Sequence, residues 1–150
     1  MEQHRHLSDR VFLKQFADQM LPPEWFTHEA HLRLAFLHIR KLGVEKAIDT
    51  VRRQLKAYVA HLGAAEKYHE TLTVAAVRAV YHFMLRENMT SPSGDFVDEP
   101  TPDEFLSLLN RHPRLRTSFR ELMFAHYKTD IFSSASAKKE YLKPELLPFD

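Results

Sequence analysis

The residues best suited to chemistry in this sequence are its ten histidines, because the chain contains no cysteine. His28 and His31 are three residues apart, so on a helix their rings can converge on one point, as in helical two-histidine metal motifs. Farther along, His69 and Glu70 add a third imidazole and a carboxylate. We predict a mononuclear metal site with His28, His31 and His69 as ligands, which leaves one coordination position open for water.

The chemistry of such a site would be hydrolysis or proton transfer. Glu70 would move the proton with His69 as the second catalytic residue, while Trp25, Phe26 and Tyr68 would shape the substrate pocket. A metal-free variant uses His69 and Glu70 alone as an acid–base pair. The cofactor is left open, and one divalent metal such as zinc, nickel or iron is the candidate.

A structural interpretation competes with this one. A buried histidine can satisfy both ring nitrogens with a side-chain or backbone partner, and helical cores tolerate several such groups. His38 stands alone on its turn and fits that interpretation best. The sequence argues against a di-iron bundle, because its Glu-x-x-His motif normally occurs twice and the chain has it once, from Glu66 to His69.

The helix that must carry the first histidines is predicted between Thr27, a favoured N-cap residue, and Gly43, a typical helix stop. A helix turns by 100° per residue, so, with Glu29 at zero, Arg33 lies at roughly 40° and His31 at roughly 200° around the helix axis. We therefore expect Glu29 and Arg33 to mark the solvent side. On the opposite side, His31 and His38 would point inward.

Helical spacing and capping residues predict the other elements as well. The first expected helix has about 12 residues after Ser8, with Phe12, Phe16 and Met20 inward and Pro22-Pro23 as its end. Two longer helices are expected from Val44 to Leu62, closed by Gly63, and from Ala64 to Asn88, irregular around His69 to Thr71. Two shorter ones are expected from Pro102 to about Arg111, after the capping box that begins at Thr101, and from Ser118 or earlier to about Tyr127. Thr90 to Pro100 reads as a loop, and Leu142, Leu146, Leu147 and Phe149 would pin an extended tail. The fold class is all-α: one domain over residues 1–150, a bundle of four main helices with shorter C-terminal helices.

Composition excludes several functions. Only 3 of the 150 residues are glycine, so no glycine-rich phosphate loop exists. The 21 basic and 20 acidic residues give a formal net charge of +1. Nucleic-acid binding favours a basic surplus, so we predict no nucleic acid as partner. The sequence also has no membrane-spanning run and no secretion signal after its polar beginning, which predicts a cytoplasmic protein without a membrane partner. The oligomeric state is left open.

Three segments resemble a known group of sequences. Phe26-Thr27-His28-Glu29-Ala30-His31-Leu32, Tyr68-His69-Glu70-Thr71-Leu72-Thr73 and the proline-bearing ending from Tyr141 to Pro148 are similar to a family of small bacterial proteins without an assigned reaction. The resemblance implies an all-helical single domain. The DinB-like metal-dependent bundles share only this architecture, because their His-x-x-x-His pair is absent here.

Two classes of function therefore compete. The first is a small metal-dependent or His/Glu acid–base enzyme with a pocket lined by the inward histidines. The second is a helical module without turnover that binds a small ligand or another protein, with Trp25, Phe26 and the loop around Phe96 as part of its surface. A structural or storage protein is weakly supported, because no heptad pattern persists beyond one helix.

Overall fold

The computed structural model describes residues 2–89 and 102–147, and within these ranges all regular structure is helical. The α-helices are α1 (Asp9–Ala17), α2 (His28–Leu42), α3 (Val44–His61), α4 (Glu70–Arg86), α5 (Pro102–Arg111), α6 (Arg114–Thr117), α7 (Phe119–His126) and α8 (Ala135–Lys139), with short 3-10 helices η1 (Gln3–His6), η2 (Pro23–Trp25) and η3 (Ala65–Lys67). The all-α class is confirmed. In the described part of the chain, no helix is long and apolar enough to span a membrane.

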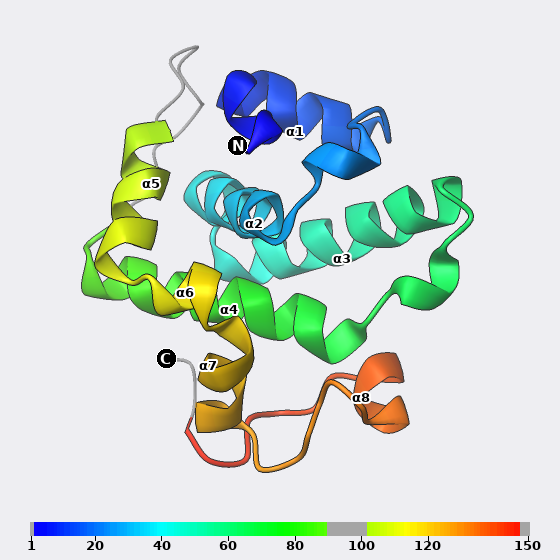
Figure 1. Cartoon of the computed structure of the whole chain (residues 1–150), viewed down its shortest axis with the longest axis vertical. Helices are drawn as coiled ribbons and strands as arrows, with labels where there is room; N and C mark the ends of the chain where they lie inside the picture. Colours follow the sequence, from blue (N-terminus) through cyan, green and yellow to red (C-terminus); the bar gives the residue numbers. More distant parts are fainter. Residues whose placement is uncertain (1, 90–101, 148–150) are drawn as a thin grey trace.

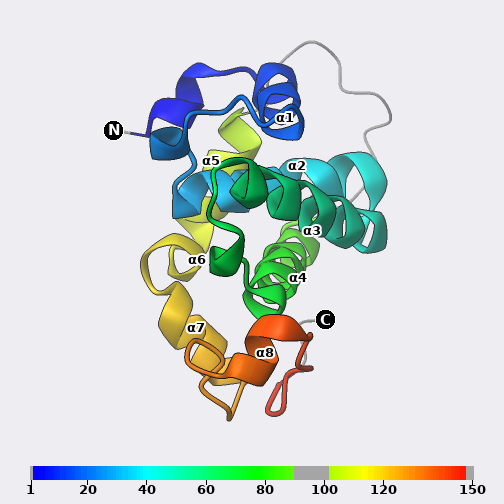
Figure 2. The ribbon, with the colours of Figure 1, turned by 90° about the vertical axis from the view of Figure 1, so that its right-hand side faces the viewer.

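Three helices form the middle of the molecule. α2 packs against both α3 and α4, which also pack against each other. α1 lies at one end of this group, against α3, and α8 lies at the other end, against α4 (Figures 1 and 2). The central helix α2 is buried on almost every side, including Leu32, Leu34, Phe36 and Ile39. It therefore has no broad solvent face, unlike a typical surface helix.

Helix caps explain most of the observed boundaries. Ser8 and Thr27 accept hydrogen bonds from the backbone amides of Val11 and Ala30, as N-caps do. Gly43 ends α2 with a φ of +83°, a conformation that residues with a side chain rarely adopt. The predicted bounds of the second, third and fifth helices agree with α2, α3 and α5 to within a residue or two. The loop predicted over 90–100 and the cap at Thr101 lie outside the described residues.

The first helix is shorter than predicted. α1 ends at Ala17 because Gln19 adopts a left-handed conformation with a φ of 58°. The amides of Gln19 and Met20 then bond back to the carbonyls of Phe16 and Gln15, which is a Schellman motif formed without glycine. As a result Met20 leaves the predicted inward row and is 70% exposed.

The fourth and sixth predicted helices also differ from the observed ones. The fourth begins at Glu70, because η3 and the N-cap residue His69 take up the residues before it. The sixth is divided at Ser118 into α6 and α7.

The tail prediction was only partly right. Leu142 is partly buried against the core, but Leu146 and Leu147 are 54% and 56% exposed, and Phe149 lies outside the described residues. Hydrogen bonds hold this part of the tail instead. Leu146 donates its amide proton to the carbonyl of His126, whose Nδ1 lies 2.8 Å from the Leu147 carbonyl oxygen.

The solvent side predicted for the second helix was wrong. Glu29 and Arg33 are each only 2% exposed, because the residues before α1 fold over them. The Arg33 guanidinium donates to the carbonyl oxygens of His4 and Leu7 and to the Asp9 carboxylate, at 2.6 to 2.8 Å. The charged face of α2 is therefore an internal contact surface for the first ten residues.

Candidate functional site

His69 is bound through both ring nitrogens. Its Nδ1 accepts the amide proton of Leu72 at 3.0 Å, which makes His69 the N-cap of α4. Its Nε2 lies 2.7 Å from the carbonyl oxygen of Ile131. Since a carbonyl oxygen only accepts, Nε2 carries the proton and donates it. Neither nitrogen has a lone pair left for a metal ion.

Glu70 pairs with residues other than histidine. Its carboxylate lies 2.8 Å from Nε of Arg52 and accepts a 2.7 Å hydrogen bond from the hydroxyl of Tyr68. Burial of Glu70 alone would raise the pKa of its carboxyl, but the Tyr68 and Arg52 contacts outweigh it and hold the pKa below its usual value. Burial, together with Glu70, raises the pKa of Tyr68. At neutral pH this group is a fixed carboxylate between a phenol and a guanidinium, and Glu70 lacks the raised pKa of a typical general acid.

His28 is exposed at the first turn of α2. Its Nε2 donates to the carbonyl oxygen of Leu115 at 2.9 Å, and its ring packs edge-on against Phe119 with the centroids 4.9 Å apart. His28 therefore joins α2 to α6 and α7. It does not point into the helical core as predicted.

His31 points inward, with its ring 5.6 Å from that of Phe26. Its Nε2 is buried and has no hydrogen-bond partner among the described residues. Burial lowers the pKa of His31 to about 4, and the nearby His28 adds to the effect. His31 is thus a neutral imidazole at physiological pH.

The three predicted metal ligands do not converge. In the described part of the chain, a single set of three or more His, Asp or Glu side chains has ligand atoms within 4.8 Å of one another, and it comprises Glu2, His4 and Glu29. The arrangement of His28, His31 and His69 predicted from helical spacing is therefore not formed. The physical reason is that His28 and His69 each bind a backbone carbonyl, of Leu115 and Ile131, in a distant segment.

The Glu2, His4 and Glu29 set does not fit a divalent metal either. Nδ1 of His4 lies 3.3 Å from an Arg33 nitrogen, and arginine only donates, so Nδ1 accepts and Nε2 carries the proton toward Glu29 at 2.8 Å. Arg5 already binds both oxygens of Glu29, at 2.6 and 2.8 Å. A metal ion would have to displace these donors beside a buried guanidinium. The set is a buried ion-pair network that fastens the first residues to α2.

His38 is buried against α3, as the structural interpretation expected. Burial lowers the pKa of His38 to about 4, with Lys41 and Arg53 contributing in the same direction and Gln54 opposing them. Both ring nitrogens and the Gln54 amide oxygen lack a well-formed hydrogen bond among the described residues. His38 is thus a neutral, buried core residue.

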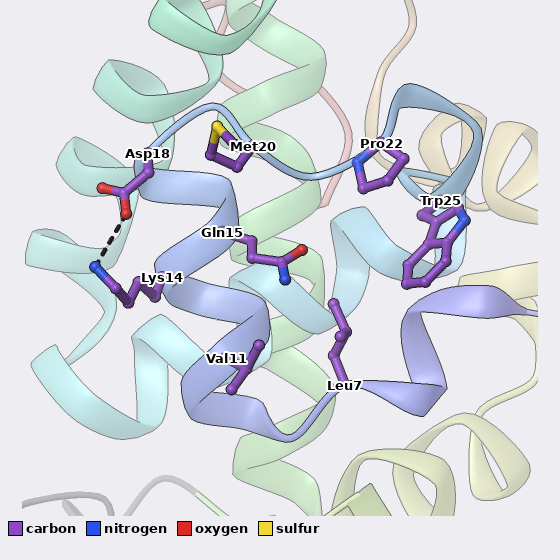
Figure 3. A pocket seen from close by; sticks show the side chains of 8 residues that line it. All are labelled: Leu7, Val11, Lys14, Gln15, Asp18, Met20, Pro22 and Trp25. Carbon is purple, nitrogen blue, oxygen red and sulfur yellow. Dashed lines mark hydrogen bonds and ion pairs between the residues drawn. The ribbon is translucent and has the colours of Figure 1, made fainter.

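A cleft of about 600 Å³ lies beside α1, at the end of the molecule away from α8 (Figure 3). Its lining comprises Leu7, Val11, Lys14, Gln15, Asp18, Met20, Pro22 and Trp25. Trp25 comes from η2 and stands at one side of the cleft, and Lys14 and Asp18 stand at the other, with Gln15 between them (Figure 3). Pockets of 300 to 1,000 Å³, mostly apolar with a few polar groups, are typical of small-molecule sites.

The other predicted pocket residues lie elsewhere. Phe26 belongs to an aromatic cluster in the core, with its ring 4.7 Å from Phe16 and 5.4 Å from Tyr58. Tyr68 contacts Glu70, and its ring lies 5.2 Å from Nζ of Lys56. Of the predicted substrate-binding residues, Trp25 lines the cleft, while Phe26 and Tyr68 do not belong to its lining.

Sequence reasoning missed most of the cleft. Met20 was expected to face inward and Gln15 was not singled out, because the end of α1 at Ala17 has no glycine signal. The remaining signal was Lys14 and Asp18, four residues apart on α1, whose ion pair at 3.1 Å now forms part of the cleft wall.

Comparison with known proteins gives no family for this chain. No protein-family model, no curated protein sequence and no solved structure matches it. The resemblance to small bacterial proteins therefore stays a prediction.

Proposed function

We propose that this protein is a helical binding module that takes a small, mainly apolar molecule into the cleft between α1 and η2. The observation that carries the proposal is the size and lining of the cleft, with five apolar residues, Leu7, Val11, Met20, Pro22 and Trp25, around it. Burying the apolar surface of a ligand against such walls supplies the driving force for binding. The proposal follows the second of the two sequence-based alternatives.

The enzyme hypothesis receives less support from the geometry. His69 has both ring nitrogens occupied, and the Glu70 carboxylate is neutralised by Arg52. Moving a proton needs a group with a free site and a pKa near the working pH. His69 has no free site, and the pKa of the Glu70 carboxyl is held below its usual value.

Tryptophan fluorescence tests the proposal directly, because Trp25 is the single tryptophan of the chain and lines the cleft. The probe is 1-adamantanol, a rigid apolar alcohol that does not absorb where tryptophan is excited. We expect a saturable change in Trp25 emission with a Kd on the order of 0.1–1 mM. This value corresponds to a binding free energy of about 0.4–0.5 kcal/mol for each heavy atom of the probe.

Two arginine variants provide the comparison. Val11 in the cleft and Leu85 on α4 are both apolar helix residues, 41% and 39% exposed. Val11→Arg should weaken binding at least tenfold because the long charged side chain enters the cleft, whereas Leu85→Arg should leave the Kd unchanged. A wild-type protein with no saturable signal, or a Val11→Arg variant that binds as well as wild type, would contradict the proposal.

A further inference from the structure

We infer that the ligand of this cleft is a neutral molecule whose apolar body carries one carboxamide-like edge, a hydrogen-bond donor beside an acceptor, and that Gln15 recognises this edge. The inference rests on the proposed function. It names the chemical class of the ligand from the polar groups of the cleft.

The charges of the cleft offer no unpaired counter-charge to an ionic ligand. Lys14 and Asp18 are the charged residues in its lining, and Nζ of Lys14 lies 3.1 Å from Oδ2 of Asp18 (Figure 3). The two charges neutralise each other, so the lining has no net charge. A carboxylate or ammonium ligand would have to lose water in an apolar cleft without gaining a free counter-charge, which is costly. A neutral ligand avoids this cost.

Gln15 is the neutral polar side chain of the lining, and it lies between the ion pair and Trp25 (Figure 3). Within the described ranges, no side chain or backbone group forms a hydrogen bond with its amide, although its backbone carbonyl accepts the amide protons of Met20 and Leu21. Those two bonds hold the backbone of Gln15 in place at the end of α1. The side-chain amide is left to bind a ligand.

An amide presents an acceptor oxygen and a donor nitrogen side by side. A ligand edge of the same kind can form two hydrogen bonds with it, in the way that glutamine pairs with the edge of adenine. A ketone can use only the donor of Gln15, and a carboxylate would face its oxygen with a second acceptor. Gln15 therefore favours a carboxamide or lactam edge over either alternative.

Three ligands with the same apolar body test this preference: 1-adamantanecarboxamide, 1-adamantyl methyl ketone and 1-adamantanecarboxylate. Binding is followed by Trp25 emission and by the side-chain NH2 signals of Gln15 in NMR spectra. For the wild type we expect the carboxamide to bind at least threefold tighter than the ketone and at least tenfold tighter than the carboxylate. The Gln15 signals should shift most with the carboxamide.

Two variants then assign the preference to its residues. Gln15→Leu keeps the size of the side chain but removes the amide, so the carboxamide should lose its advantage over the ketone while the ketone still binds. Asp18→Asn leaves Lys14 unpaired, so the carboxylate should gain at least fivefold relative to the carboxamide. Glu66→Gln, at an exposed carboxylate outside the lining, is the control and should change neither ratio.

The outcomes separate the inference from the proposed function. If all three ligands bind equally well, or if Gln15→Leu leaves the ratio of carboxamide to ketone unchanged, the inference on the ligand class is overturned while binding in the cleft stands. A tighter carboxylate in the wild type overturns it as well. If none of the three ligands binds, the proposed function itself fails.

Discussion

Three histidines of this protein bind backbone carbonyls in distant segments. His28 donates to Leu115, His69 to Ile131, and His126 lies 2.8 Å from the carbonyl oxygen of Leu147 through its Nδ1. Each of these contacts joins residues at least 21 positions apart in sequence. The N–H group of a neutral imidazole is a good donor for a carbonyl that would otherwise be left unpaired. His28 and His69 therefore fasten the C-terminal third of the chain to α2 and to the start of α4, while His126 fastens the tail to α7.

His69 allows the first prediction. His69→Ala removes the N-cap of α4 and the donor for Ile131, so we expect the free energy of unfolding to fall by about 1–3 kcal/mol. Asparagine is a good N-cap but is too short to replace the ring at Ile131, so His69→Asn should recover about 1 kcal/mol of the loss. Urea denaturation measures both values. An alanine variant as stable as the wild type would show that His69 has no structural role.

The buried imidazoles give a pH prediction. The pKa of both His31 and His38 is lowered from 6.5 to about 4, so between these values the unfolded chain binds more protons than the folded one. Stability is then fully present above pH 6.5 and falls as the pH decreases toward 4, by about 3 kcal/mol for each group. Carboxylates with lowered pKa values, such as Glu29 and Glu70, lose their contribution only below about 4.5.

Urea unfolding at several values from pH 7 to pH 5 checks this. We expect His31→Gln and His38→Gln each to reduce the slope of stability against pH in this range. NMR titration of the imidazole signals provides the independent measurement. If both rings titrate near 6.5 in the folded protein, the prediction fails.

At the scale of single elements, three helices end in the same way. α1, α3 and α4 are followed by Gln19, Gly63 and Asn88, each with a φ between 56° and 70°. In each case the residue after it donates its amide proton to the carbonyl five positions earlier, as in the Schellman motif. Glycine adopts this conformation without steric cost, asparagine tolerates it, and glutamine does so at a greater cost.

Opposite effects are therefore expected at two of these positions. Gln19→Gly should stabilise the protein by roughly 0.5–1 kcal/mol, because it relieves the left-handed strain. Gly63→Ala should destabilise it by about 1 kcal/mol, although an added Cβ there would meet no atom within 4 Å, so the cost comes from φ alone. Thermal unfolding of both variants decides the matter, and a shift of the same sign for both would contradict the explanation.

At the scale of the whole molecule, the first ten residues and α2 depend on one another. Arg33 is buried and donates to the backbone of His4 and Leu7 and to Asp9, while Glu29 binds Arg5 and His4. Because Leu7 also lines the cleft, this network holds one wall of the proposed binding site.

Arg33→Leu should therefore destabilise the protein by roughly 3–5 kcal/mol, because it removes the guanidinium that binds the buried Asp9 carboxylate and leaves the Leu7 carbonyl without its donor. Arg33→Lys keeps the charge but loses the planar fork, and its loss should be intermediate. Arg53→Leu on the exposed side of α3 is the control, with an expected change within about 0.5 kcal/mol. Urea denaturation measures all three, and a loss below 1 kcal/mol for Arg33→Leu would refute the role of this network.

The sequence by itself determined the helical class and most helix bounds, because caps such as Ser8 and Thr27 and apolar spacing act within a few residues of themselves. The same local rules could not show which face of α2 is buried. Periodicity separates charged from apolar sides, but a charged side is buried when another segment supplies matching partners, as the first ten residues do for Glu29 and Arg33.

The candidate site depended on tertiary structure for the same reason. Spacing put His28 and His31 on one helix turn, but the carbonyl oxygens that bind His28 and His69 belong to Leu115 and Ile131, which are far away in sequence. The cleft around Gln15 and Trp25 exists because α1 ends at Ala17 without a glycine and the chain turns back across it. Backbone hydrogen bonds stabilise that turn, and their donors and acceptors come together only in the folded chain.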